Sequence, residues 1–253
     1  MDGGHTPESK VVTVLVTGFG PFQQEWPVNP SFEIARSLPE YLSSAPEESV
    51  KIRIIGYGSP IRVSYDDVRE LVPVLHDSYN GSVDIVLHIG MASGRKYYAI
   101  ERYAHRDGYD RNNDLDKRKL PPDDGQKWYP DCPAKMATSL QFEDVFKRWQ
   151  SNVNEAPREA FSQQQNQNGN QITDVRMSYD AGHYLCDFIY FNSLAYFARR
   201  SGEIEGGRSP GRPVLFLHVP PESNEDAIMR GRAVTTALVQ AMADSWAADV
   251  RGD

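Results

Sequence analysis

Three short, almost wholly apolar segments set the strongest constraint on the fold. They cover Val11–Thr17, Val83–Ile89 and Pro213–Val219, and each is followed at once by Gly or Pro. Short apolar runs of this kind, rich in Val, Ile and Leu, are typical of strands that are buried on both faces of a sheet. We therefore predict a single α/β domain, an open α/β/α sandwich with a mostly parallel, twisted sheet.

Weaker strand patterns and several helical patterns fill the chain between these segments. Further strands are predicted over 50–57, 97–104 and 175–178, and helices over 31–38, 63–76, 141–152, 181–199 and 223–247. Ser31 is predicted to cap the first helix and Ser223 the last one. The helix over 181–199 carries few charged residues, so we expect it to be buried.

Two polar segments interrupt this alternation. Residues 105–135 are rich in charge, Gly and Pro, and they are interpreted as a long polar surface loop that could act as a lid. Residues 154–171 form a low-complexity, Gln/Asn-rich insertion, which we expect to be disordered.

Charge and cysteine content narrow the function classes. The formal net charge of the 253-residue chain is −8, which argues against nucleic acid and anionic membrane surfaces as partners. No apolar run approaches the length of about 18 residues that a membrane span requires. The N-terminus lacks the pattern of a secretion signal, and only two cysteines are present. We therefore expect a reducing, cytoplasmic location.

Cys186 is the stronger of two candidate nucleophiles. It lies near the start of the predicted buried helix, where unpaired N–H groups and a positive potential lower a thiol pKa and can hold an oxyanion. Cys132 lies in the polar loop, where no predicted helix or strand would position it. The alternative for Cys186 is an inert, buried thiol, which is the usual fate of a free cysteine.

A cysteine nucleophile needs a base, and the base needs a group that orients it. His88 and His218 both lie near the carboxyl end of an apolar strand, where ligand and catalytic groups of such sheets collect. Two prolines follow His218 and would hold its backbone rigid. Glu101 closes an apolar stretch, so burial beside a histidine is expected. The alternatives are a core histidine bonded to backbone and an ordinary solvated carboxylate.

Metal and phosphate sites have little support in the sequence. No CxxC or HExxH motif and no acidic cluster at ligand spacing occurs, so we expect no bound metal. The glycine-containing segment 90–95 (GMASGR) fits neither a P-loop nor a dinucleotide-binding fingerprint.

Four short motifs, taken together, carry a resemblance to a known family. They are TGFGPF at 17–22 with NPS at 29–31, HIG at 88–90 with ERYA at 101–104, DAGHYLCD at 180–187, and FLHVPP at 216–221. In this order they resemble the signatures of pyroglutamyl peptidase I, a family of cysteine peptidases that cleave N-terminal pyroglutamate. The matches span roughly residues 12–242, and their joint occurrence is far more specific than any one of them.

The resemblance implies a role for each matching position. It implies that Glu101, Cys186 and His218 form a catalytic triad. The substrate-binding residues that it implies are Phe19, Phe22, Asn29, Tyr184 and Leu185, with Asn29 bracing the N-terminal loop. It also implies one catalytic domain over 1–253 with a phosphorylase/hydrolase-like fold, peptide substrates with N-terminal pyroglutamate, and no metal or organic cofactor. A homo-oligomer is left open.

The sequence departs from the family pattern in three places. Residues 103–106 (YAHR) replace a stretch that is more apolar in bacterial members, the 109–133 loop does not align cleanly, and the Gln/Asn-rich insertion is additional. These changes affect substrate access more than chemistry. Two other functions remain open at this point: a catalytically silent protein that binds modified N-termini, and a nucleoside phosphorylase-like transferase.

Overall fold

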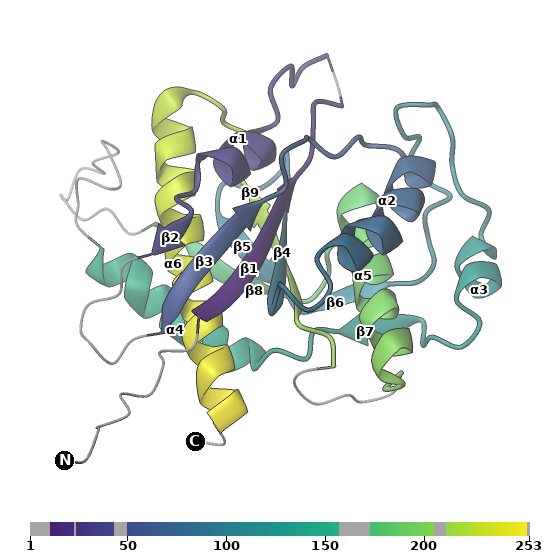
Figure 1. Cartoon of the computed structure of the whole chain (residues 1–253). Helices are drawn as coiled ribbons and strands as arrows, with labels where there is room; N and C mark the ends of the chain where they lie inside the picture. The colour runs from purple at the N-terminus through teal and green to yellow at the C-terminus, as the bar shows by residue number, and fades with distance from the viewer. Residues whose placement is uncertain (1–10, 23, 43–49, 157–172, 205–210, 252–253) are drawn as a thin grey trace, which may run out of the picture.

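A seven-stranded sheet forms the centre of the computed structural model, which describes residues 11–22, 24–42, 50–156, 173–204 and 211–251 (Figure 1). The strands lie in the order β2-β3-β1-β4-β9-β5-β8. Their bounds are Val11–Gly18 for β1, Tyr41–Leu42 for β2, Lys51–Gly56 for β3, Ile85–Met91 for β4, Tyr98–Glu101 for β5, Val175–Ser178 for β8 and Val214–Val219 for β9.

The centre of the sheet is parallel, as the apolar segments predict. Strands β3, β1, β4 and β9 run in one direction, and every residue of β4 and β9 is buried. Strand β2 is antiparallel to β3, and β5 is antiparallel to β9. The predicted fold class, a mostly parallel open α/β/α sandwich, is confirmed. The reversed direction of β5 is the feature that matters for the site.

Helices cover both faces of the sheet (Figure 1). Residues of α1 (Pro30–Ser37), α4 (Phe142–Glu155) and α6 (Glu225–Arg251) join one hydrophobic core. Residues of α2 (Tyr65–Ser78) and α5 (Leu185–Ser201) join the core on the opposite face. Of the 17 residues in α5, 11 are buried, so the prediction of a buried helix is confirmed.

Both predicted helix caps are wrong by a residue or two. The side chain of Asn29, not Ser31, accepts the hydrogen bond that caps α1, and the donor is the Ser31 N–H. At α6 the side chain of Asn224 accepts a hydrogen bond from the Ala227 N–H. Asn is as good a helix cap as Ser, so composition alone does not select between neighbouring candidates.

The strand predicted over 97–104 divides in two. Strand β5 ends at Glu101, and β6 (Tyr103–His105) then pairs with β7 (Lys135–Ala137) in a separate two-stranded sheet. This two-stranded sheet packs beside α5, on the side of the molecule where Figure 1 labels α3. The break at residue 102 lets the chain leave the main sheet directly after Glu101.

The two polar segments have different places in the structure. Within 105–135 the chain forms the short helix α3 (Asp124–Trp128) and buries Tyr109, Leu120 and Cys132 in the core below α5. The proposed Gln/Asn-rich insertion falls largely on residues 157–172, which lie outside the described residues. In the described part of the chain, no helix has the length and apolarity that a membrane crossing needs.

Candidate active site

His218 and Glu101 meet through the unusual direction of β5. His218 lies near the carboxyl end of β9, and β5 runs antiparallel beside it with Glu101 opposite Phe216. Diagonal neighbours on antiparallel strands lie within reach of long side chains. The Glu101 Oε1 atom accepts a hydrogen bond from His218 Nδ1 at 2.8 Å. The imidazole is thereby oriented by a carboxylate, and its Nε2 atom is left for other chemistry.

Arg95 is the second partner of this carboxylate. Its Nη1 atom donates to Glu101 Oε1 at 2.5 Å, and its Nη2 atom donates to the Asp180 carbonyl at 3.2 Å. Glu101 is fully buried. Burial, the largest influence, raises the pKa of Glu101, but the hydrogen bond and charge of His218 and the charge of Arg95 outweigh it. The net pKa therefore lies below its ordinary value, and the carboxylate is ionised at neutral pH.

Cys186 lies in the first turn of α5, close to His218. The helix begins at Leu185, so Cys186 is its second residue, and the residue as a whole is only partly buried. A Cβ atom added to Gly90 would lie 2.6 Å from Cys186 Sγ. Gly90 pairs with His218 across β4 and β9. The sulfur therefore rests over the strand position next to the histidine, and a glycine there makes room for it.

A cavity of about 560 Å³ opens over these groups. Both Cys186 and His218 line it, together with the β4–β5 loop from Ala92 to Arg95. Among the described residues no hydrogen bond joins the thiol to the imidazole. Catalytic hydrogen bonds of this kind are often long in ligand-free enzymes and tighten when substrate binds.

The thiol is neutral in this state. Burial raises the pKa of Cys186 to about 12, and the negative charges of Asp187 and Glu101 add to the effect. The expectation that the helix N-terminus lowers this pKa is wrong, because burial and two carboxylates outweigh the helix potential. Attack by this sulfur therefore requires a base that removes its proton.

The start of α5 also offers backbone donors that have no acceptor within the helix. The Phe188 N–H donates to the Tyr184 carbonyl, so it is the first N–H of the helix with a helical acceptor. The N–H groups of Leu185, Cys186 and Asp187 precede it and have no acceptor within the helix. Donors in this position can stabilise negative charge on a substrate oxygen close to the sulfur.

A smaller pocket beside the thiol brings together all five predicted substrate-binding residues. Phe19, Phe22, Asn29, Tyr184 and Leu185 line it with Cys186, and the remaining lining residues are Val63 and Met91. No charged side chain lines this pocket. Asn29 also donates to the Gly20 carbonyl at 2.9 Å, so the expected bracing of the N-terminal loop is confirmed as a contact.

The structure distinguishes His218 from His88, the other candidate base. His88 is fully buried, and its two ring nitrogens contact Thr17 Oγ1 at 2.7 Å and Ser193 Oγ at 2.8 Å. Burial lowers the pKa of His88 well below its ordinary value, so this imidazole is neutral. With both nitrogens occupied and no place in the cavity lining, His88 is a core histidine.

Several site residues were not predicted from the sequence. Arg95, Asn112 and Asn113 line the larger cavity, and the Asn113 carbonyl accepts a hydrogen bond from the Tyr184 hydroxyl at 2.9 Å. Arg95 lies in the glycine-containing segment 90–95, whose sequence has no pattern that would place an arginine beside a catalytic carboxylate. Asn112 and Asn113 lie in the polar segment 105–135, which has no periodicity to indicate which side chains turn inward.

One further contact ties the helix of the thiol to the strand of the acid. The Tyr190 hydroxyl donates to the backbone carbonyl of Glu101 at 3.0 Å, and both groups are buried. Tyr190 lies one turn after Cys186 on α5. The two elements that carry the sulfur and the carboxylate are therefore connected directly.

Comparisons with known proteins identify the family. The family model of pyroglutamyl peptidase matches residues 12–152. Human pyroglutamyl-peptidase 1 is 30% identical over 232 residues, which cover 91% of this chain and 90% of that protein. Pyrrolidone-carboxylate peptidase of Pyrococcus furiosus is 26% identical over 226 residues, covering 87% and 86% of the two chains.

Solved structures give the same result for the fold. Pyrrolidone carboxyl peptidase from Thermococcus litoralis superposes with a TM-score of 0.67 at 19% identity, over 96% of both chains. A variant of the Pyrococcus furiosus enzyme superposes with a TM-score of 0.64 at 22% identity, covering 92% of this chain and all of that one. On the strength of the family match and the human relative, this chain belongs to the pyroglutamyl peptidase family.

Proposed function

We propose that this protein is a cysteine-type omega peptidase, which hydrolyses the amide bond after an N-terminal pyroglutamyl residue. Membership of the family gives the reaction class. One observation supports the assignment of residues most directly. The hydrogen-bonded pair of Glu101 and His218 lies at the cavity into which Cys186 opens.

The first step transfers a proton from the thiol to the histidine. Because the thiol is neutral, His218 acts as general base through Nε2, while the hydrogen bond from Nδ1 to Glu101 fixes the tautomer. The ionised carboxylate then stabilises the imidazolium that forms. The sulfur attacks the pyroglutamyl carbonyl carbon as it loses its proton.

The remaining steps use the start of α5 and water. Backbone N–H groups of the first helical turn stabilise the tetrahedral oxyanion, a contribution that is typically worth about 10²–10³ in rate for each donor. His218 returns the proton to the leaving amine, and a thioester to Cys186 remains. Water, deprotonated by the same imidazole, hydrolyses the thioester and restores the thiol.

The smaller pocket explains selection of pyroglutamate over an ordinary N-terminus. Pyroglutamate is a neutral lactam, whereas a free N-terminus carries an ammonium group. The pocket presents Phe19 and Phe22 to a flat ring and no carboxylate to a cation. An unpaired ammonium would lose its hydration there without compensation, so charged N-termini are excluded.

The test compares the two cysteines of the chain. Cys186→Ala should abolish release of a fluorophore from a pyroglutamyl amide, and Cys132→Ala should keep most of the activity, because Cys132 lies outside both pockets. Thermal unfolding of both variants checks that the fold is retained. Activity that survives Cys186→Ala in a folded protein would rule the assignment out.

The same assay decides between the enzyme and the two other functions. A silent binding protein would bind a pyroglutamyl peptide with no turnover in the wild-type chain. A phosphorylase-like transferase would require inorganic phosphate for turnover, whereas hydrolysis does not. The described part of the cavity favours hydrolysis, because Arg95, its one arginine, is held by Glu101.

Three wider properties complete the proposal. Both cysteines are free, and the proposed nucleophile must stay reduced, which supports a cytoplasmic location that fractionation would test. Asn112 and Asn113 support a role for the 105–135 segment in closing over substrate. The whole chain, 1–253, is proposed as one catalytic domain, and light scattering would determine its subunit number.

A further inference from the structure

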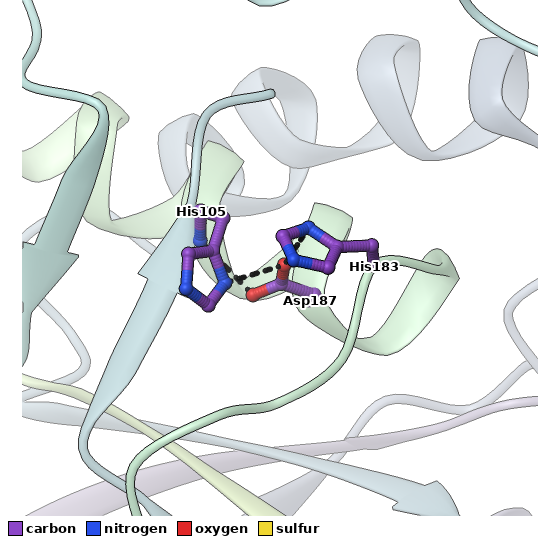
Figure 2. A group of neighbouring side chains, drawn as sticks. All are labelled: His105, His183 and Asp187. Atoms are coloured by element: carbon purple, nitrogen blue, oxygen red, sulfur yellow. Dashed lines mark hydrogen bonds and ion pairs between the residues drawn. The ribbon is translucent and has the colours of Figure 1, made fainter. Parts of the chain in front are cut away.

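A second group of reactive side chains lies just behind the proposed nucleophile. His105 at the end of β6, His183 in the loop before α5 and Asp187 in the first turn of α5 converge on one point (Figure 2). One ligand atom from each lies within 4.8 Å of the other two. None of the three residues lines either pocket, so this group is separate from the proposed catalytic residues.

The distances suit a small tetrahedral ion. The Asp187 Oδ2 atom lies 3.0 Å from His105 Nδ1 and 3.8 Å from His183 Nδ1. Zn–N and Zn–O bonds of about 2.0–2.2 Å place neighbouring ligand atoms of a tetrahedral site roughly 3.3–3.5 Å apart. A side-chain shift of a few tenths of an ångström would bring these two pairs to this separation, and the ligand atoms of the third pair, His105 and His183, lie within 4.8 Å of each other. Figure 2 shows the two imidazoles on either side of the carboxylate.

The surroundings hold these groups in place and leave one side accessible. The Asp187 carboxylate is fully buried, and its other oxygen, Oδ1, accepts the His105 backbone N–H at 3.0 Å. Both imidazoles are partly exposed, so an ion can enter from their side. Gly108 gives space to His183, because a Cβ atom there would lie 2.8 Å from its Nδ1 atom.

The charge of the surroundings is compatible with a cation. Two carboxylates, those of Asp187 and Asp180, and one ammonium, that of Lys135, lie close enough to His105 to act on it electrostatically. Two imidazole nitrogens and one carboxylate oxygen match the donors that bind Zn²⁺ and neighbouring transition metals, with a water as the fourth ligand. Hard ions such as Mg²⁺ and Ca²⁺ prefer oxygen ligands only.

We propose that His105, His183 and Asp187 form a binding site for one divalent transition-metal ion, with Zn²⁺ as the best match. The ion joins the end of β6 to the loop before α5 and to the first turn of that helix. In the metal-free protein, His183 Nδ1 contacts the Asp107 carbonyl at 3.2 Å and the Tyr109 hydroxyl donates to Asp187 Oδ2 at 3.2 Å, and the ion replaces the first of these contacts. A hydrogen bond between His105 and Asp187 occupies the place of the ion itself. The proton of that bond leaves when the ion binds, because a ligating imidazole nitrogen must be deprotonated.

Metal titration of the full chain tests this site. The Cys186→Ala chain is used, so that the nucleophilic thiol does not compete, and Co²⁺ serves as the spectroscopic probe for the zinc site. We expect one Co²⁺ per chain with a tetrahedral absorption spectrum and no thiolate charge-transfer band. Zn²⁺ should displace it and raise the melting temperature by about 5–10 °C at 100-fold excess over Kd.

Histidine variants in the same background locate the site. His183→Gln and His105→Gln should each weaken binding at least tenfold and remove the zinc-dependent stabilisation. His5→Gln is the matched control, and it should bind as the parent does. Circular dichroism identifies a histidine variant that fails to fold. In that case the metal affinity of the other histidine variant tests the proposal. The proposal is overturned by unsaturable binding up to about 1 mM Zn²⁺, or by unchanged affinity in both folded variants.

Discussion

Replacing Gly90 with alanine should nearly stop catalysis while the protein still folds. The new methyl group would lie 2.6 Å from Cys186 Sγ and 2.6 Å from the ring tip of Phe216. Ordinary contacts between such atoms are about 3.5–4.0 Å, so the sulfur must move by about 1 Å or more. A displacement of that size typically costs about 10² in rate. We therefore expect kcat to fall at least 100-fold with little change in KM.

The cost to folding should be moderate. One extra methyl group in a packed core typically destabilises a protein by about 1–3 kcal/mol, because neighbouring side chains leave their preferred positions. Chemical denaturation therefore separates a misplaced sulfur from an unfolded chain. Alkylation of Cys186 in the folded variant reports the same displacement independently of substrate.

Gly94→Ala provides the matched control. Gly94 lines the same cavity, but a Cβ atom there would meet no other atom within 4 Å. This variant should keep activity within about threefold of wild type. The reasoning is refuted if Gly90→Ala turns over pyroglutamyl amides at a rate near that of the wild type. Equal losses in both variants would refute it as well.

Three further predictions concern the groups around the imidazole. Glu101→Gln should lower kcat by about 10²–10⁴ with a normal far-UV spectrum, since the tautomer of His218 is no longer fixed; steady-state kinetics measures this, and a loss below fivefold contradicts it. Arg95→Ala should move the acid limb of the kcat/KM profile to higher pH, because Arg95 lowers the pKa of Glu101, and Arg95→Lys should restore part of the shift; superimposable wild-type and Arg95→Ala profiles would exclude this role. The rate of Cys186 alkylation by iodoacetamide should rise about tenfold per pH unit from pH 7 to 10, since burial raises the pKa of this thiol to about 12; a plateau near neutral pH would indicate a preformed thiolate instead.

The sequence was most informative about features that depend on local pattern. The apolar runs that became β1, β4 and β9 identified the centre of the sheet, because a strand buried on both faces needs apolar residues throughout. The same patterns placed Cys186 near a helix start and His218 near a strand end, although the helix begins at Leu185 and not at residue 181 as predicted. Selecting His218 over His88 required the family resemblance, since both histidines lie near the carboxyl ends of similar strands.

Features that depend on contacts between distant segments were not predictable in this way. The rule that sites collect at carboxyl ends of parallel strands does not place Glu101, because β5 runs in the opposite direction beside β9. Glu101 lies opposite Phe216, two residues before His218 in β9. Its side chain therefore reaches the imidazole from beside the strand and not from beyond the carboxyl end of the strand. The raised pKa of Cys186 likewise depends on burial by distant segments and on Glu101. Helix α3 and strand β7 are too short to produce a periodic pattern.

The hydrogen bond from Tyr190 to the Glu101 carbonyl affects how the site responds to substitutions elsewhere in the protein. This hydrogen bond connects α5, the helix that carries the Cys186 sulfur, to β5, the strand that carries the Glu101 carboxylate. Because β5 also pairs with β9, the His218 imidazole is connected to the same two elements. When substitutions in the core shift the outer helices, we expect the thiol, the imidazole and the carboxylate to move together. We therefore expect substitutions in the surrounding core to change the position of these three groups in the molecule more readily than their arrangement relative to one another.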